Sequence, residues 1–113
     1  MADDEPITLI NVFEVPADQV DELIEDWRER ARIMSTKPGF RDFRLHRAVS
    51  GDSRFQLVNV ARWDSAQALR AAVSDPEFRT RRAEAITTSP VLEQGANPAT
   101  YRVVAEQVAD PEK

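Results

Sequence analysis

The sequence contains no cysteine, a single histidine and only three glycines. The absence of cysteine excludes disulfides, thiolate metal sites and a cysteine nucleophile. One histidine argues against a metal centre built from imidazoles, and three glycines leave no glycine-rich phosphate loop. No Ser-His-Asp pattern can be assembled convincingly. These absences argue against phosphoryl transfer, against nicotinamide or flavin chemistry of the usual kinds, and against a metal site.

The chain also lacks a basic excess and a long apolar run. Fifteen basic residues stand against twenty acidic ones, a formal net charge of −5, so neither a nucleic acid nor an anionic membrane is an expected partner. No apolar stretch approaches the length of a membrane span, and the acidic start at 2–5 is unlike the basic start of a signal peptide. We therefore expect a soluble cytoplasmic domain over residues 7–108, with flexible tails at 1–6 and 109–113.

The first part of the chain predicts a strand, a long helix and a second strand. Residues 7–15 alternate as a strand, which Pro16 ends. An apolar stripe at helical spacing then predicts an amphipathic helix as far as Met34, and the Lys-Pro-Gly sequence at 37–39 ends it. Residues 40–49 predict the second strand. The helix has its basic residues last, the polarity that the helix dipole favours: Arg28, Arg30 and Arg32.

The second part predicts one more strand, two helical segments and a last strand. Residues 54–63 alternate as the third strand. A helix over 64–73 is expected to be capped by Asp64, and a proline opens a further helical segment over 76–86. Residues 87–98 are polar and rich in turn formers, so they predict a loop. The last strand is expected over residues 100–108.

This order of elements predicts an α+β, ferredoxin-like βαββαβ fold. Its four-stranded antiparallel sheet has strand order 4-1-3-2 and carries the helices on one face, so the first and third strands are central neighbours. The other face would expose Ile10, Val12, Val58 and Val60, a surface too apolar for open water. We therefore expect a homodimer.

Two asparagines on these central strands are the most informative polar residues. Strand alternation places Asn11 and Asn59 on the apolar faces of their strands, and Trp63 on the same face as Asn59. A buried amide without partners costs about 1–3 kcal/mol, so each amide either bonds internally or serves a ligand. Asn59 could hold a ligand oxygen while Trp63 forms a wall for a flat ring. The alternative is a core tryptophan beside an asparagine that backbone groups satisfy.

Three other residues are candidates for the same site. Arg82 lies on the apolar stripe of its helix, four residues after Phe78. It can extend its stem over the core and place its head in solvent, or it can point into a cavity and stabilise an anion such as a phenolate. His46 is of the residue type that titrates near neutral pH, which makes it a candidate base, although a lone strand histidine is more often structural or exposed. Trp27, in the long helix, is expected in the core beside this space.

The sequence resembles the antibiotic biosynthesis monooxygenase family, whose members are small dimeric α+β barrels. The segments that carry the resemblance extend from the first strand to the second helical region, about two thirds of the chain. They are residues 10–15, Trp27, and residues 38–40, 45–47 and 58–65.

One group of these relatives converts anthrone-type phenols of aromatic polyketide pathways to quinones with molecular oxygen. The resemblance implies that Asn59, Trp63 and Arg82 match their site residues, and that Leu69 stands where some of them carry a tyrosine. Because the substrate supplies the electrons, the resemblance implies that no cofactor is needed. Haem-degrading relatives use a strand asparagine, which Asn11 matches, but their helix tryptophan is Ala72 here and an arginine replaces their iron-binding histidine.

The leading hypothesis is therefore a cofactor-independent monooxygenase that acts on a polycyclic phenol, anthrone or hydroquinone. Asn59 would hold the substrate oxygen, Trp63 would form a wall for the ring, and Arg82 would stabilise the anion. Around the substrate we expect the remaining candidates, Asn11, Trp27, His46 and Leu69. The alternatives are a non-catalytic ligand-binding or interaction dimer, and a polyketide cyclase or isomerase on the same scaffold.

Overall fold

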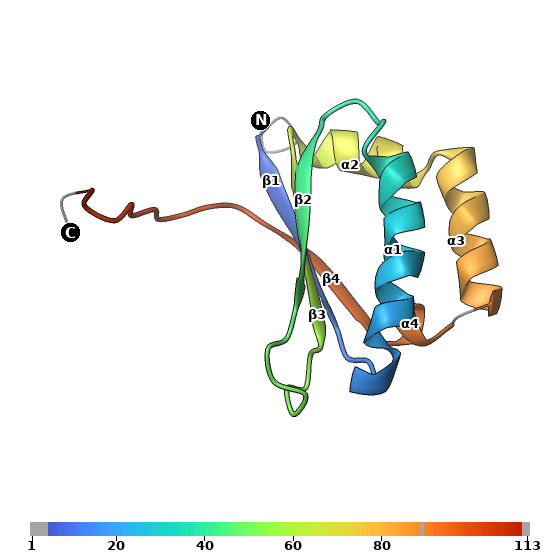
Figure 1. Ribbon diagram of the computed structural model, residues 1–113. Coiled ribbons are helices and arrows are strands. Elements are labelled where there is room, and N and C mark those ends of the chain that lie inside the picture. Colours follow the sequence, from blue (N-terminus) through green and yellow to red (C-terminus); the bar gives the residue numbers. More distant parts are fainter. Residues whose placement is uncertain (1–4, 89, 112–113) are drawn as a thin grey trace.

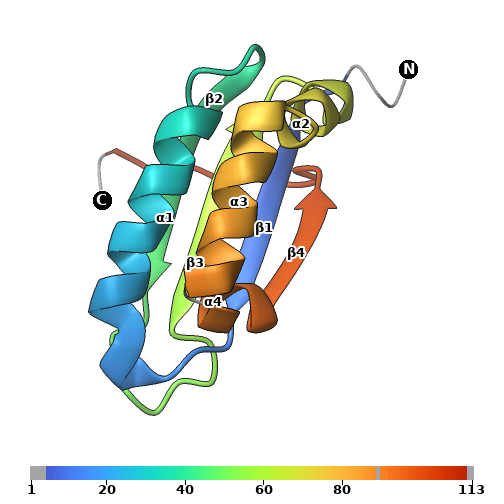
Figure 2. The same ribbon diagram turned by 90° about the vertical axis from the view of Figure 1, so that its right-hand side faces the viewer.

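The computed structural model describes residues 5–88 and 90–111 and shows one antiparallel sheet covered on one face by helices (Figures 1 and 2). The sheet has the strand order β2-β3-β1-β4, which is the predicted order. The predicted α+β, ferredoxin-like class is confirmed. The strands are β1 (Ile7–Phe13), β2 (Phe40–Arg47), β3 (Leu57–Trp63) and β4 (Ala96–Tyr101).

The helices all lie on the same side of the sheet. Figure 2 shows α1 and α3 side by side across it, with α2 near one end and α4 near the other. They are the short 3-10 turn η2 (Ala17–Gln19), α1 (Val20–Met34), α2 (Ala66–Val73), α3 (Pro76–Thr88) and α4 (Pro90–Gln94). No helix in the described part of the chain is long and apolar enough to cross a membrane.

Strand alternation decides which side chains face the helices. Along β3 the odd-numbered residues, from Leu57 to Trp63, are buried and the even-numbered ones are more exposed. The buried residues form two clusters, one around Phe13 and Leu57 and the other around Ala61 and Trp63. Between these clusters, Asn11 and Asn59 are direct cross-strand partners on β1 and β3, as the predicted sheet requires.

The helix cap after β3 differs from the prediction. Ser65, not Asp64, is the N-cap of α2, and its hydroxyl accepts a hydrogen bond from the Ala68 amide at 3.1 Å. The carboxylate of Asp64 instead accepts a hydrogen bond from Arg41 on β2 at 2.6 Å. Asp64 and Ser65 are both residue types that cap helices. Because Asp64 is bonded to Arg41, Ser65 provides the cap.

The C-terminal part differs more. The predicted loop over 87–98 is wrong, because α4 forms within it and buries Leu92 against the core. The predicted last strand over 100–108 is also placed too late: β4 pairs with β1 from Ala96 to Tyr101 and ends where its partner begins. Beyond it, residues 102–110 have no regular structure and extend away from the body (Figure 1). Position 89, residues 1–4 of the predicted N-terminal tail and residues 112–113 of the predicted C-terminal tail lie outside the described residues.

Gly39 lies in the turn between α1 and β2, against the start of α2, and replacing it should be costly. Its φ is 87°, a backbone conformation that residues with a Cβ rarely adopt, and an added Cβ would lie 2.4 Å from the Cβ of Ala68. We expect Gly39→Ala to lower the free energy of unfolding by about 2 kcal/mol or more, as measured by urea denaturation.

Gly51 provides the matched control, because an added Cβ there meets nothing within 4 Å. Gly51→Ala should change the free energy of unfolding by less than about 0.5 kcal/mol. Equal denaturation midpoints for the two variants would contradict the steric account of Gly39.

Candidate functional site

A cavity of about 520 Å³ lies between the helix-facing side of the sheet and helices α1 and α3. Its size is within the range of about 300–1,000 Å³ that small-molecule sites occupy. All four strands and helices α1 to α4 contribute to its wall, which contains both tryptophans, both central asparagines and a group of charged residues. The lining residues are Leu9, Asn11, Trp27, Arg30, Ala31, Met34, Phe40, Phe43, Asn59, Ala61, Trp63, Leu69, Arg70, Val73, Phe78, Arg82, Glu93, Ala96 and Pro98.

Aromatic side chains make one wall of the cavity rigid. Trp63 meets Phe40 edge to face, with ring centroids 5.3 Å apart. Phe40 contacts Phe43, and Phe43 in turn meets Trp27 edge to face at 6.5 Å. Such pairs hold their rings in fixed relative orientations. The wall can therefore present an apolar surface to a flat ring system without collapsing into the cavity.

The two asparagines, although cross-strand partners, have different environments. The Oδ1 atom of Asn11 accepts a hydrogen bond from the Asn97 backbone amide at 2.9 Å. This bond lies next to Pro98, which pairs with Asn11 in the sheet register and has no N–H to donate. The side chain of Asn11 thus stabilises the edge of the sheet. Asn59 is 1% exposed, and its Oδ1 has no hydrogen-bond partner.

The residues that line the cavity carry the buried polar atoms that have no hydrogen-bond partner in the described part of the structure. Among the described residues, five buried side-chain nitrogen and oxygen atoms have no hydrogen-bond partner, and all belong to residues that line this cavity. They are the Nε1 atoms of Trp27 and Trp63, Nε and Nη2 of Arg30, and Oδ1 of Asn59. Buried polar groups are normally bonded. Four unpartnered donors and one unpartnered acceptor, all on residues that line one cavity, favour a binding site for a polar, flat molecule.

Three charged side chains lie together at one side of the cavity. Arg30, on α1, donates from Nη1 to a Glu93 carboxylate oxygen at 2.8 Å. Arg82, on α3, donates from Nη2 to the other oxygen of Glu93 at 3.0 Å. The side chains of Arg30 and Glu93 are 8% and 20% exposed, whereas that of Arg82 is 52% exposed. Arg82 therefore lies at the rim and Arg30 inside.

The charges of this group do not cancel. The hydrogen bond from Arg82 holds the pKa of Glu93 below its ordinary value, and the bond from Arg30 acts in the same direction, while burial opposes both. The bond to Glu93 likewise raises the pKa of Arg82. Glu93 is therefore ionised at neutral pH, and two guanidinium groups against one carboxylate leave a net charge of one positive unit. Such a site favours an anion.

Six of the seven residues that the sequence nominates for a site line this cavity: Asn11, Trp27, Asn59, Trp63, Leu69 and Arg82. Their assigned roles remain predictions. For Arg82 the structure combines the two alternatives, because the side chain is half exposed while its head bonds to Glu93. The seventh residue is not part of the cavity.

His46 faces the other side of the sheet. Its neighbour Leu45 packs against the core beneath the helices, so alternation along β2 turns His46 to the opposite face. There it is exposed, with Nδ1 3.3 Å from the Val58 carbonyl oxygen. Strand parity thus places the ring outside this cavity, and the role of His46 as a base that contacts the substrate stays a prediction without support from this geometry.

Sequence reasoning missed Arg30 and Glu93. Arg30 was interpreted only as part of the basic end of the helix, yet it lies three residues after Trp27 and four before Met34, on the buried stripe of α1. That spacing was the available signal. Glu93 gave no such signal, because it lies on the five-residue helix α4, in a segment whose composition predicts a loop. No group of three or more histidine, cysteine or acidic side chains able to hold a metal ion occurs among the described residues.

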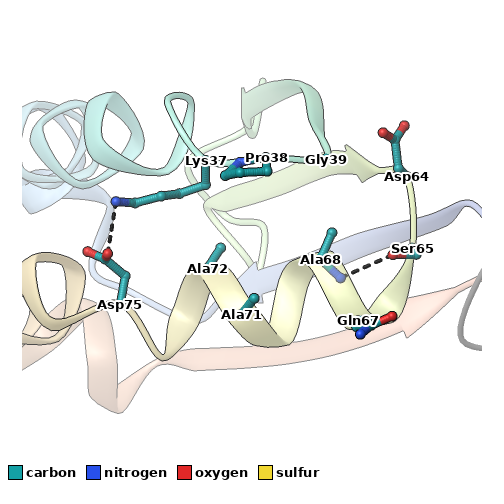
Figure 3. Close-up of a pocket in the computed structure, with 10 residues that line it drawn as sticks. All are labelled: Lys37, Pro38, Gly39, Asp64, Ser65, Gln67, Ala68, Ala71, Ala72 and Asp75. Atoms are coloured by element: carbon teal, nitrogen blue, oxygen red, sulfur yellow. Dashed lines mark hydrogen bonds and ion pairs between the residues drawn. The ribbon is translucent and has the colours of Figure 1, made fainter.

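A second hollow, of about 450 Å³, lies between α2 and the turn that precedes β2. Figure 3 shows two bonds among its polar groups: Lys37 pairs with Asp75 at 3.1 Å, and Ser65 caps α2 at Ala68. Asp64 bonds to Arg41 on β2. None of the unpartnered buried atoms belongs to the residues that line it. The polar groups of this hollow are therefore accounted for by the fold, and the first cavity is the better candidate.

Known proteins resemble this chain in sequence. The antibiotic biosynthesis monooxygenase family matches residues 6–84. A Mycobacterium tuberculosis protein described as a heme oxygenase (mycobilin-producing) is 37% identical over 71 residues, which make up 63% of this chain and 66% of that protein. The match thus spans just under two thirds of the relative's own length.

Solved structures share the fold. A protein of Shewanella loihica PV-4, described as a candidate monooxygenase, is 33% identical with a TM-score of 0.68, and the match covers 90% of this chain and 97% of that one. SnoaB, a cofactor-independent oxygenase from Streptomyces nogalater, is 22% identical with a TM-score of 0.64, over 92% of this chain and 96% of that one. At the latter identity the likeness is one of fold alone.

Proposed function

This chain belongs to the antibiotic biosynthesis monooxygenase family, and from that premise we propose that it oxidises a polycyclic phenol of the anthrone or hydroquinone type with molecular oxygen and without a cofactor. The observation that carries the proposal is the set of unpartnered polar atoms around the apolar cavity. A fused-ring phenol supplies what these atoms lack, since it combines flat apolar faces with a hydroxyl that donates and oxygens that accept.

In the proposed complex, Asn59 and Trp63 hold the reacting end of the substrate. The Oδ1 atom of Asn59 accepts the hydrogen bond of a substrate hydroxyl, while Trp63 forms the wall on which the ring lies. Trp63 also offers its unpartnered Nε1–H to a substrate oxygen. Leu69 and Trp27, which line the same cavity, complete an apolar enclosure around the rings.

The chemistry begins with loss of a proton from the substrate. Arg30 and Arg82 favour the resulting anion, because a nearby positive charge lowers the pKa of a phenol or an activated methylene. Glu93 is a poor base, since two arginines hold its pKa low. The proton can therefore leave to water at the rim, and the protein contributes by stabilising the anion.

The remaining steps balance with oxygen as the oxidant. The substrate anion gives one electron to molecular oxygen, and the resulting carbon radical and superoxide combine into a peroxide on the ring carbon. The peroxide takes up a proton; the remaining C–H proton of that carbon is then lost as the O–O bond breaks, so that the carbonyl of the quinone forms and the released hydroxide leaves with a proton as water. One anthrone and one dioxygen thus give one anthraquinone and one water. No external reductant is consumed.

The proposal is tested by mixing the protein with dithranol, a dihydroxyanthrone, under anaerobic conditions and then adding oxygen. Quinone absorbance should rise faster with protein than in buffer alone, and the excess rate should saturate with substrate. Bovine serum albumin at the same concentration controls for nonspecific acceleration. A rate that protein does not raise would contradict the enzymatic proposal for this substrate class.

Haem degradation is the second candidate, and the 37% identity with the Mycobacterium tuberculosis heme oxygenase favours it. In its disfavour, the only histidine of the chain, His46, lies outside the cavity. Titration with hemin tests it: a saturable Soret shift, followed by loss of the Soret band with ascorbate and oxygen, would support haem as the substrate.

A binding protein without turnover would instead bind dithranol or hemin and leave both unchanged. A cyclase or isomerase would convert a polyketide substrate without consuming oxygen.

We also propose that the chain works as a cytoplasmic homodimer that buries the outer sheet face. Ile10 pairs with Val60, and Val12 with Val58, on the two central strands. A second copy would remove this apolar patch from water. We expect Val60→Glu to shift the mass measured by light scattering from twice 12.8 kDa to 12.8 kDa.

Val49→Glu is the control for that experiment, because Val49 is fully exposed outside the strands. The control should keep the mass of the unmodified protein. A monomeric unmodified protein, or a dimer that Val60→Glu leaves intact, would refute this interface.

A further inference from the structure

We propose that the ligand of the cavity carries a carboxylate, which Arg30 binds through two parallel hydrogen bonds. The inference rests on the proposed function and narrows its substrate class to polycyclic phenols with an acidic substituent. Its starting point is the state of one buried guanidinium group. Arg30 is 7% exposed, and two of its three nitrogens have no partner.

The identity of the free nitrogens determines the chemistry. Nη1 of Arg30 is bonded to Glu93 at 2.8 Å, whereas Nε and Nη2 are unpartnered. Nε–H and one N–H of Nη2 point the same way along one edge of the planar group. This edge is the fork that binds the two oxygens of a carboxylate side by side. A single carbonyl oxygen can bridge both donors only through bent hydrogen bonds, and it brings no negative charge.

The charge of the cluster agrees with this reading. Glu93 already accepts hydrogen bonds from both Arg30 and Arg82, so one positive charge is left over. The excess charge is shared between the buried Arg30 and the half-exposed Arg82, and a ligand carboxylate beside Arg30 would offset it. Glu93 holds the guanidinium by Nη1, and so acts as a positioning residue that leaves Nε and Nη2 unpartnered in a side chain that lines the cavity.

The positions of the polar atoms give the ligand two ends. Trp27 and Arg30 approach from α1, on the helix side of the cavity, whereas Asn59 and Trp63 approach from β3, on the sheet side. The acceptor, Asn59 Oδ1, is on the sheet side. The ligand is therefore expected to present its phenol to the sheet and its carboxylate to α1.

Two dihydroxyanthraquinones provide a matched pair of probes. Rhein carries one carboxylate, and danthron has the same hydroxyl and keto groups without the acid. Binding is measured by titration calorimetry and by quenching of Trp27 and Trp63, which are the only tryptophans of the chain. We expect rhein to bind about tenfold more tightly than danthron, or better, because charge-assisted paired hydrogen bonds are the strong ones.

Three variants locate the effect. Arg30→Met keeps an apolar stem, and should abolish the preference for rhein while changing danthron affinity less than about threefold. Glu93→Gln keeps an oxygen that can accept from Nη1 of Arg30 and removes the negative charge beside the guanidinium, so it should increase the preference. Arg54→Met removes an exposed arginine that pairs with Glu14 on the surface, and should leave both affinities unchanged. Circular dichroism spectra confirm that each variant is folded, and Glu93→Gln tests the proposal even if Arg30→Met does not fold.

Equal binding of rhein and danthron by the unmodified protein would overturn the inference. So would an Arg30→Met variant that loses both ligands equally, since Arg30 would then read the hydroxyl and keto oxygens. The proposed function fails separately: rhein could bind with the expected preference although no anthrone is oxidised. Conversely, rapid oxidation of dithranol without any preference for rhein would refute the carboxylate site alone.

Discussion

Replacing Asn59 with alanine is expected to slow quinone formation by about 100-fold, because the substrate hydroxyl loses the hydrogen bond that orients the ring for reaction. The fold should tolerate the change, because Oδ1 of Asn59 is buried without a partner and its removal breaks no bond that the structure contains. Initial rates after oxygen addition measure the first effect, and urea denaturation measures the second.

Asn11→Ala is the control for this prediction, since the two asparagines are cross-strand partners on the same face. The side chain of Asn11 bonds to the Asn97 amide, so its loss should cost stability of about 1 kcal/mol and affect the rate much less. An Asn59→Ala protein with full activity would remove the role assigned to that amide. A reversed pattern, with activity depending on Asn11, would move the reacting end of the ligand to β1.

Trp63→Ala is expected to cause the largest loss of stability, about 3–5 kcal/mol. Trp63 is 1% exposed and meets the ring of Phe40 at 5.3 Å, so alanine would leave a hole beside the aromatic wall. Denaturation in urea gives the free energy of unfolding directly.

Trp63→Phe separates packing from binding at the same position. Phenylalanine keeps most of the buried apolar surface, so the loss of stability should stay below about 1.5 kcal/mol, but it removes the Nε1–H that has no partner in the protein. A ligand that uses this donor should bind more weakly to Trp63→Phe. If Trp63→Phe binds danthron and rhein as the unmodified protein does, Trp63 serves only as core and wall.

Most of the fold could be predicted because its signals are local. Strand alternation correctly predicted the inward face of β3, and the order of elements predicted the sheet β2-β3-β1-β4. The failures came where a local signal was weak. The segment that contains α4 has the composition of a loop. It forms a helix because Leu92 packs in the core. The last strand ends at Tyr101, which pairs with Thr8 near the start of β1.

The residues of the candidate site were likewise predictable only in part. Asn59, Trp63 and Arg82 could be nominated because each violates or marks a periodic pattern, and the structure places all three on one cavity. His46 was a candidate because imidazole titrates near neutral pH. Alternation along β2 places its side chain on the sheet face opposite the cavity. Arg30 was overlooked because an arginine among other charged residues is usually solvated.

By itself the sequence determined which residues face inward, which strands are neighbours, and the family to which the chain belongs, because periodicity and short motifs are properties of consecutive residues. Only the tertiary structure decided which of the two central asparagines is available to a ligand. It gave Asn11 a backbone partner and left Asn59 without one. It also joined Arg30 to Glu93, 63 positions away, and left the other two guanidinium nitrogens of Arg30 without a partner. Such a contact depends on how α1 and α4 pack on the same sheet, and no local pattern encodes it.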